Sequence, residues 1–174
     1  MKRSMLAVGD VFLVPLGPDR SAAGQVVARY GDAYYFALFE RSHALSAPPE
    51  PADAVRDHVS LLALSLDARV RDGTWTVIGN VPVSGDIRLP VYREAIGSPD
   101  QADVVDHTGT LRRRASVAEA SALPTRKIVA PIRLERAVRA KAGLEPWQDA
   151  YSEFEPANFA SGQDAFSPRH GTFH

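Results

Sequence analysis

The stretch Val8–Glu40, VGDVFLVPLGPDRSAAGQVVARYGDAYYFALFE, decides the fold of this chain. It holds three apolar, β-branched or aromatic runs, Val11–Leu16, Gln25–Tyr30 and Ala33–Glu40, separated by glycine, proline and aspartate residues typical of turns. Strands joined by turns this short are expected to form an antiparallel meander whose inner face nucleates a core. Because Pro15 has no backbone N–H to donate, the first strand either lies at an edge or ends near this residue.

Further strand signals follow the meander. Val59–Leu66 is an apolar run that suits either a buried strand or about a turn and a half of helix, and a strand is favoured. Thr74–Gly79 alternates in the manner of a strand. Val81–Tyr92 contains two prolines, so any strand there, such as Ile87–Leu89, is expected to be short and at an edge.

A second hairpin is predicted near the middle of the chain. Ala102–Asp106 and Thr110–Arg114 flank the connection His107-Thr108-Gly109, in which glycine stands where a bulged hairpin requires it. His107 is accordingly expected to be an exposed turn residue.

The pattern then becomes helical. Ser116 and Glu119 have the spacing of a capping box, which predicts a short helix that ends before Pro124. A longer helix is predicted over Ile132–Ala142, with Pro131 in its first turn and Gly143 as its C-terminal glycine.

A last short helix is expected between Pro146 and Pro156. Trp147, Tyr151 and Phe154 would lie on one face of it, because they are spaced i, i+4 and i+7.

These elements predict an α+β fold: an antiparallel bent sheet or small open β-barrel with the C-terminal helices packed on it. One domain is expected over residues 1–156, with strands mainly at 8–114 and helices at 116–155, followed by a loosely packed tail at 157–174. The expected core anchors are Val11, Leu16, Val26, Phe36, Leu38, Trp75, Val77, Leu134, Val138 and Trp147.

Composition narrows the functional classes. The chain has 174 residues, a formal net charge of −1 and no cysteine, so disulfides and thiolate metal sites are excluded and a reducing compartment is suited. The apolar run after Lys2 and Arg3 is shorter than a signal peptide requires, and no run approaches the length of a membrane span. A cytoplasmic location and no membrane partner are therefore expected.

No catalytic or cofactor motif stands out. The five histidines show no metal-ligand spacing, the glycines do not form a phosphate loop, and no G-x-S-x-G nucleophile elbow occurs. A Ser-His-Asp set can be assembled on paper from almost any chain of this length. We therefore expect no enzyme activity, no metal and no cofactor.

Charge is distributed unevenly along the chain. From Arg112 to Lys141 there are nine lysines or arginines against Glu119 and Glu135, whereas the chain after Glu145 is acidic. These residues are either solvated faces with some ion pairs, such as Glu135 with Arg139, or a patch that faces a partner of opposite charge.

Several segments in order resemble the immunity protein 26 family of bacterial polymorphic toxin systems, over about Val8–Phe154. The Pro-rich loop Ser46–Ala52 and the tail after Pro156 depart from that resemblance. The segments that carry it are Gly9-Asp10-Val11-Phe12, Pro15-Leu16, Gly24-Gln25-Val26, Phe36–Phe39, Gly73–Asn80 with Pro82, Gly109 with Arg112-Arg113, Ser116–Glu119, Leu134–Ala137, Gly143, Trp147 and Tyr151.

The resemblance implies a non-enzymatic protein that binds and neutralises a cognate toxin, often a nuclease. On that basis the acidic residues Asp149, Glu153 and Glu155 are candidates to imitate phosphate in a basic nuclease cleft. The alternative surface is the basic face that includes Arg112 and Arg113, which would suit an acidic toxin.

Two other classes of function stay open. A small SH3-like β-barrel with a helical appendage would bind nucleic acid or a peptide, although the near-zero net charge argues against nucleic acid. On a strand, Arg112-Arg113-Arg114 would point alternately to opposite faces, which leaves only two arginines on one side. An enzyme is the least supported class, because no acid, base or nucleophile set is apparent.

Overall fold

A computed structural model describes residues 6–160 and 162–167. The chain divides into two compact units, unit 1 of Met1–Ile87 with Lys127–Asn158 and unit 2 of Arg88–Arg126 with Phe159–His174. Each has its own antiparallel sheet, neither sheet closes into a barrel, and the predicted α+β class is confirmed. The expected division into one domain over residues 1–156 and a tail differs from this partition.

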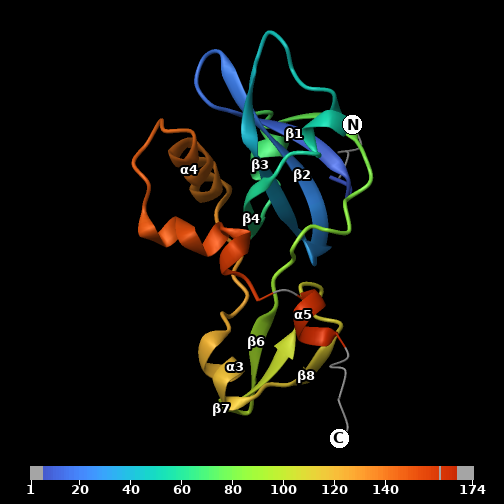
Figure 1. Cartoon of the computed structure of the whole chain (residues 1–174), viewed down its shortest axis with the longest axis vertical. Coiled ribbons are helices and arrows are strands. Elements are labelled where there is room, and N and C mark those ends of the chain that lie inside the picture. The colour runs from blue at the N-terminus through green and yellow to red at the C-terminus, as the bar shows by residue number, and fades with distance from the viewer. Residues whose placement is uncertain (1–5, 161, 168–174) are drawn as a thin grey trace, which may run out of the picture. The chain divides into compact units, whose positions relative to one another are not determined.

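The sheet of unit 1 contains the predicted meander (Figure 1). Its strand order is β4-β3-β2-β1-β5, with antiparallel pairing throughout. β1 ends at Pro15, as expected, but it is not an edge strand because β5 pairs with its other side. The bounds are Asp10–Pro15 for β1, Arg20–Tyr30 for β2, Ala33–Ala44 for β3, Val59–Ser65 for β4 and Thr76–Asn80 for β5.

The two central strands are longer than their apolar runs. β2 starts at Arg20, opposite Ala44 of β3, and Ser21 pairs with His43. The first residues of β2 are small or polar, so their strand conformation comes from pairing with β3 rather than from intrinsic β-propensity. Sequence patterns therefore underestimated the lengths of β2 and β3 at this end of the sheet.

Of the helices in unit 1, the one predicted over Ile132–Ala142 is confirmed, whereas the four-residue helices Pro51–Ala54 and Ala68–Arg71 were not predicted. α4 has Pro131 at its start and is followed by Gly143, whose φ of 77° is left-handed. The expected α-helix after Pro146 is instead the 3₁₀ helix η1, which Trp147 precedes. The bounds are Pro51–Ala54 for α1, Ala68–Arg71 for α2, Pro131–Lys141 for α4, Asp149–Phe154 for η1 and Pro156–Asn158 for η2.

The main core of unit 1 is built around three aromatic rings between the sheet and α4, which lies beside β4 (Figure 1). Phe12 stacks on Trp75 with ring centroids 5.2 Å apart, and Phe36 meets the two rings edge-on at 5.4 Å and 5.6 Å. Gly24 lies against Phe12, where a Cβ would come within 2.4 Å of the ring. The Phe12 ring thus occupies the space that a side chain at Gly24, its partner on β2, would take.

Eight of the ten expected core anchors are buried. The predictions for Val77 and Trp147 are wrong, because these residues are 40% and 37% exposed. Side chains two residues apart share a face only within a strand. Because Trp75 precedes β5, its burial does not imply that the side chain of Val77 is buried. Trp147 is exposed because the regular helix that would turn it inward is absent.

A polar contact also anchors α4. The indole N–H of Trp75 donates to Oε2 of Glu135 at 3.0 Å, and Nε of Arg69 lies 3.2 Å from the same oxygen. The expected Glu135–Arg139 pair is therefore wrong, and Arg139 pairs with Glu145 at 2.9 Å. Glu135 supplies the acceptor that the indole N–H of the buried Trp75 needs.

Unit 2 has a three-stranded sheet of order β6-β7-β8. The predicted hairpin is formed by β7 and β8, and the predicted capping box of Ser116 and Glu119 is present at the start of α3. The strand expected at Ile87–Leu89 is wrong, because these residues are not in a strand. β6 was missed because its exposed residues give no clear alternation. The bounds are Tyr92–Ile96 for β6, Ser98–Val105 for β7, Arg112–Arg114 for β8, Val117–Ala122 for α3 and Gly162–Phe166 for α5.

Part of the expected loose tail is packed in unit 2. The N–H of Val91 donates to the carbonyl of Ala160 at 3.1 Å, and the N–H of Gly162 donates to the carbonyl of Leu89 at 3.1 Å. Residues 161 and 168–174 of that tail lie outside the described residues. Within the described part of the chain, no helix is long and apolar enough to cross a membrane.

Candidate functional site

A groove opens in unit 1 where the ends of β2 and β3 approach the C-terminal end of α4. We call it the α4 groove; its volume is about 160 Å³. Its floor is apolar and its rim carries arginine, lysine and glutamate side chains. The lining residues are Leu16, Arg20, Ala22, Phe39, Glu40, Ser42, Ser60, Val138, Lys141, Ala142 and Leu144.

The end of α4 shapes one wall of this groove. The N–H of Gly143 donates to the carbonyl of Ala140 at 3.0 Å, and the N–H of Leu144 donates to that of Arg139 at 2.9 Å. These are the two hydrogen bonds of a Schellman motif, which needs a left-handed residue at Gly143. The motif turns the chain sharply and places Leu144, 49% exposed, on the wall of the groove.

An aromatic side chain extends this wall. Nζ of Lys141 lies 4.9 Å from the ring centroid of Trp147, a cation–π distance, so Trp147 is next to a groove residue. Leu144, which lines the groove, and Trp147, which contacts the groove residue Lys141, are thus two exposed apolar side chains at this end of α4. Trp147 belongs to the residue types that supply most binding energy at protein interfaces.

Arg20 on the opposite rim is held by neutral partners. Its Nε donates to the hydroxyl of Ser42 at 3.0 Å and its Nη2 donates to the carbonyl of Ser42 at 3.2 Å. No ion pair to a carboxylate is formed by Arg20 within the described ranges. Its positive charge is thus fixed in place and not neutralised by the protein.

The three predicted acidic residues are together in unit 1, on η1 and the residue after it. Glu153 pairs with Arg133 at 2.6 Å and with Lys127 at 3.6 Å, and Glu155 pairs with Lys141 at 2.6 Å. Asp149 is exposed and forms no ion pair among the residues that the structure describes. Two of the three charges are therefore neutralised by cations at α4, and Glu155 lies at the edge of the α4 groove.

The two predicted basic residues belong to unit 2, and both are paired. Arg112 pairs with Glu94 at 2.9 Å and approaches Asp103 at 3.6 Å. Arg114 also approaches Asp103, whereas Arg113 binds Glu119, so the three arginines alternate as the strand pattern predicts.

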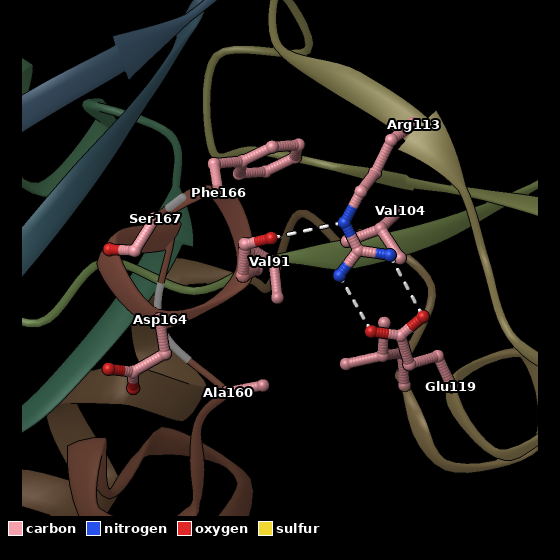
Figure 2. Close-up of a pocket in the computed structure, with 10 residues that line it drawn as sticks. Val91, Val104, Arg113, Glu119, Ala160, Asp164, Phe166 and Ser167 are labelled. Carbon is pink, nitrogen blue, oxygen red and sulfur yellow. Dashed lines mark hydrogen bonds and ion pairs between the residues drawn. The ribbon is translucent and has the colours of Figure 1, made fainter. Parts of the chain in front are cut away.

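Arg113 lies in the wall of a second cavity, of about 560 Å³, within unit 2 (Figure 2). Its guanidinium donates to both oxygens of Glu119, at 2.9 Å and 2.7 Å, and through Nε to the carbonyl of Ala165 at 3.0 Å. These hydrogen bonds, with one from the N–H of Ser116, lower the pKa of Glu119 to about 2. The arginine is thus a structural tie between β8, α3 and α5 rather than an open anion site.

The turn of the β7–β8 hairpin is organised by a buried carboxylate. Asp106 accepts hydrogen bonds from the hydroxyl of Thr108 and from the N–H groups of Thr110 and Leu111. Burial alone would raise the pKa of Asp106, but these hydrogen bonds hold it below its ordinary value. His107 is half-buried rather than exposed as expected, and burial lowers its pKa.

Sequence reasoning missed the α4 groove itself. Its strand residue Arg20 and its helix-end residue Leu144 are far apart in the chain, and no local pattern links them. The one available signal was a leucine directly after the glycine that ends a helix, since such a residue contacts the helix end or stays exposed. Among the described residues, no group of three or more His, Asp or Glu is placed to hold a metal ion.

Comparisons of this chain with protein-family models, curated proteins and solved structures found no match. The resemblance to immunity protein 26 therefore stays a prediction. The α4 groove is the candidate site on the geometry of this chain alone.

Proposed function

We propose that this chain is an immunity protein that binds and neutralises a cognate bacterial toxin, with a nuclease as the expected toxin class. Inhibition is by protein–protein contact in the cytoplasm, without catalysis or a cofactor. The observation that supports this proposal is the α4 groove, where exposed Leu144 lies on the wall beside buried apolar side chains and Trp147 contacts the groove residue Lys141. An apolar centre with a polar rim is the usual anatomy of a protein interface.

The groove would be the centre of a larger contact. A stable complex covers roughly 800 Å² on each partner, which is more than one groove supplies. The surface around Trp147 and η1 would complete it, with Asp149 as the acidic residue that has no cation of its own among the described residues. A negative charge at this rim would speed the encounter with a basic nuclease.

Co-expression with the protein encoded by the neighbouring open reading frame tests the proposal. We expect the neighbour to stop growth alone, to be tolerated together with this chain, and to co-purify with it. A harmless neighbour, or a toxic one that this chain does not counteract, would overturn the immunity function.

A matched pair of variants tests the site. Leu144→Asp should weaken binding and rescue, because it places a charge in an apolar contact. Leu66→Asp is the control, since Leu66 is similarly exposed, at 42%, and follows the end of β4 remote from the groove residue Ser60. Equal loss in the two variants would argue against the groove as the contact.

The alternative function, a nucleic-acid or peptide-binding module, makes a different prediction. Nucleic-acid binding would appear as a salt-dependent shift of an oligonucleotide. The ion pairs of Arg112 and Arg113 leave little free positive charge for phosphate on β8, so we expect no such shift.

A further inference from the structure

We infer that the α4 groove receives one large apolar side chain of the partner, from a segment in which an aspartate or glutamate is next to that side chain. This inference rests on the proposed protein-binding function and names the chemistry of the segment that is bound.

The size of the groove sets the first limit. A cavity of about 150 Å³ lined by apolar side chains is large enough to bind benzene. The α4 groove, at about 160 Å³, therefore fits one aromatic ring or one branched aliphatic side chain. A whole helix or strand does not fit, so the partner inserts a single residue.

The floor determines that this residue is apolar. Leu16, Ala22, Phe39 and Val138 are all buried, and their side chains offer no hydrogen-bond partner to water. Water over these four side chains is poorly held, and its displacement by an apolar group is favourable.

The rim determines the neighbouring charge. Arg20 is held by Ser42 and has no carboxylate partner within the described residues, so it is ready to receive one. Lys141 is already paired with Glu155. Arg20 is therefore the cation that selects an acidic partner.

Glu40 on the same rim restricts where that acidic group lies. The guanidinium of Arg20 binds Ser42, two residues along β3 from Glu40, which is about 7 Å at the rise of a strand. A carboxylate that approaches Arg20 from the side away from Glu40 avoids most of the repulsion from Glu40, whereas one between Arg20 and Glu40 does not. The acidic residue thus has a defined side.

The test uses capped dipeptides and backbone amide NMR shifts of the full chain. Acetyl-Phe-Glu-amide should shift amides lining the groove with millimolar affinity. We expect acetyl-Phe-Gln-amide to bind about fivefold more weakly, and acetyl-Phe-Lys-amide and acetyl-Ala-Glu-amide to give no shifts there. No groove shifts up to about 10 mM, or equal binding of the Glu and Lys peptides, would overturn the inference.

Two variants separate the roles of the rim and the floor. Arg20→Gln should remove the preference for Glu over Gln while the Phe side chain still binds, and Arg29→Gln, an exposed arginine outside the groove, should retain it. Ala142→Leu should block the groove without disturbing the fold, since Ala142 is exposed. A Glu preference that survives in Arg20→Gln would contradict the assignment of the charge.

The outcome is independent of the toxin experiment. Dipeptide binding with a harmless neighbour would keep this inference and reject the immunity function. A toxin that binds and is neutralised, while the dipeptides leave the groove unshifted, would keep the function and reject this inference.

Discussion

The two units of this chain differ in the contacts that stabilise each of them internally. Unit 1 places stacked aromatic rings between a five-stranded sheet and α4. Unit 2 has three strands and few buried apolar side chains, and charged hydrogen bonds connect its segments. Among the described residues of unit 2, the buried apolar ones are Val91, Tyr92, Ala102, Val104 and Val105. A small unit buries less of its surface, so directional polar contacts carry more of its stability.

Arginines make most of these polar connections in unit 2. Arg93 donates to the carbonyl of Ala120 at 2.7 Å, and Arg126 donates to that of Asp106 at 2.7 Å while its guanidinium lies over the ring of Tyr92. With Arg113, they tie α3, α5 and the loop after α3 to the sheet. The comparison thus predicts that unit 1 responds to changes of volume and unit 2 to changes of charge.

The largest effect is expected in the core of unit 1. Phe12→Ala removes a ring that is fully buried and contacts two others, and we expect a loss of about 3–5 kcal/mol in the free energy of unfolding. Urea unfolding followed by tryptophan fluorescence measures it. Val77→Ala, on an exposed side chain, should cost less than about 0.5 kcal/mol. Similar costs for the two would refute the assignment of the core.

A change in the opposite direction tests the same packing. Gly24→Ala would place a Cβ 2.4 Å from the ring of Phe12 and 2.9 Å from the carbonyl of Ala37, at a cost of about 1–3 kcal/mol. Gly85→Ala is the control, because nothing lies within 4 Å of the position that a Cβ would take there. The double variant Phe12→Leu with Gly24→Ala should recover part of the loss, and strict additivity would contradict a steric cause.

In unit 2, Arg113→Met should open the contacts of α3 and α5 with the sheet. We expect about 1–3 kcal/mol less protection against amide hydrogen exchange there, because Glu119 and the carbonyl of Ala165 lose their donor. Arg112→Met, which removes an exposed ion pair with Glu94 and leaves Asp103 beside Arg114, should change protection by less than about 1 kcal/mol. An equal loss of protection in the two variants would show that Arg113 does not hold α3 and α5 against the sheet.

Acid should affect unit 2 through Glu119. Its pKa is about 2 in the fold against 4.5 ordinarily, so the ionised carboxylate stabilises the fold above pH 4.5 and that contribution is lost as the pH falls toward 2. Amide exchange across unit 2 measured over this range should show the loss. Glu119→Gln should be less stable at neutral pH and lack this acid-dependent step, and an unchanged step would assign it to another carboxyl.

The features that local sequence patterns predicted correctly are those that depend on neighbouring residues in the chain. The meander follows from short turns between apolar runs, and the ends of α4 follow from Pro131 and Gly143. The capping box of Ser116 and Glu119 was predictable for the same reason. Each of these features depends on residues a few positions apart.

The features that sequence patterns missed depend on the fold around them rather than on neighbouring residues in the chain. β6 carries little alternation and forms because β7 pairs with it. Trp147 fits a helical stripe, but the 3₁₀ helix that actually forms begins after it. The α4 groove joins β2, β3 and the end of α4, and its composition could not be derived from any single segment.

The most direct test of the proposed function is a hydrogen-exchange footprint of this chain in complex with the protein encoded by its neighbouring gene. We predict added protection at the ends of β2 and β3 and in the segment from Lys141 to Trp147, with unit 2 unchanged. Protection confined to unit 2, or absent around the α4 groove, would contradict the groove as the inhibitory surface.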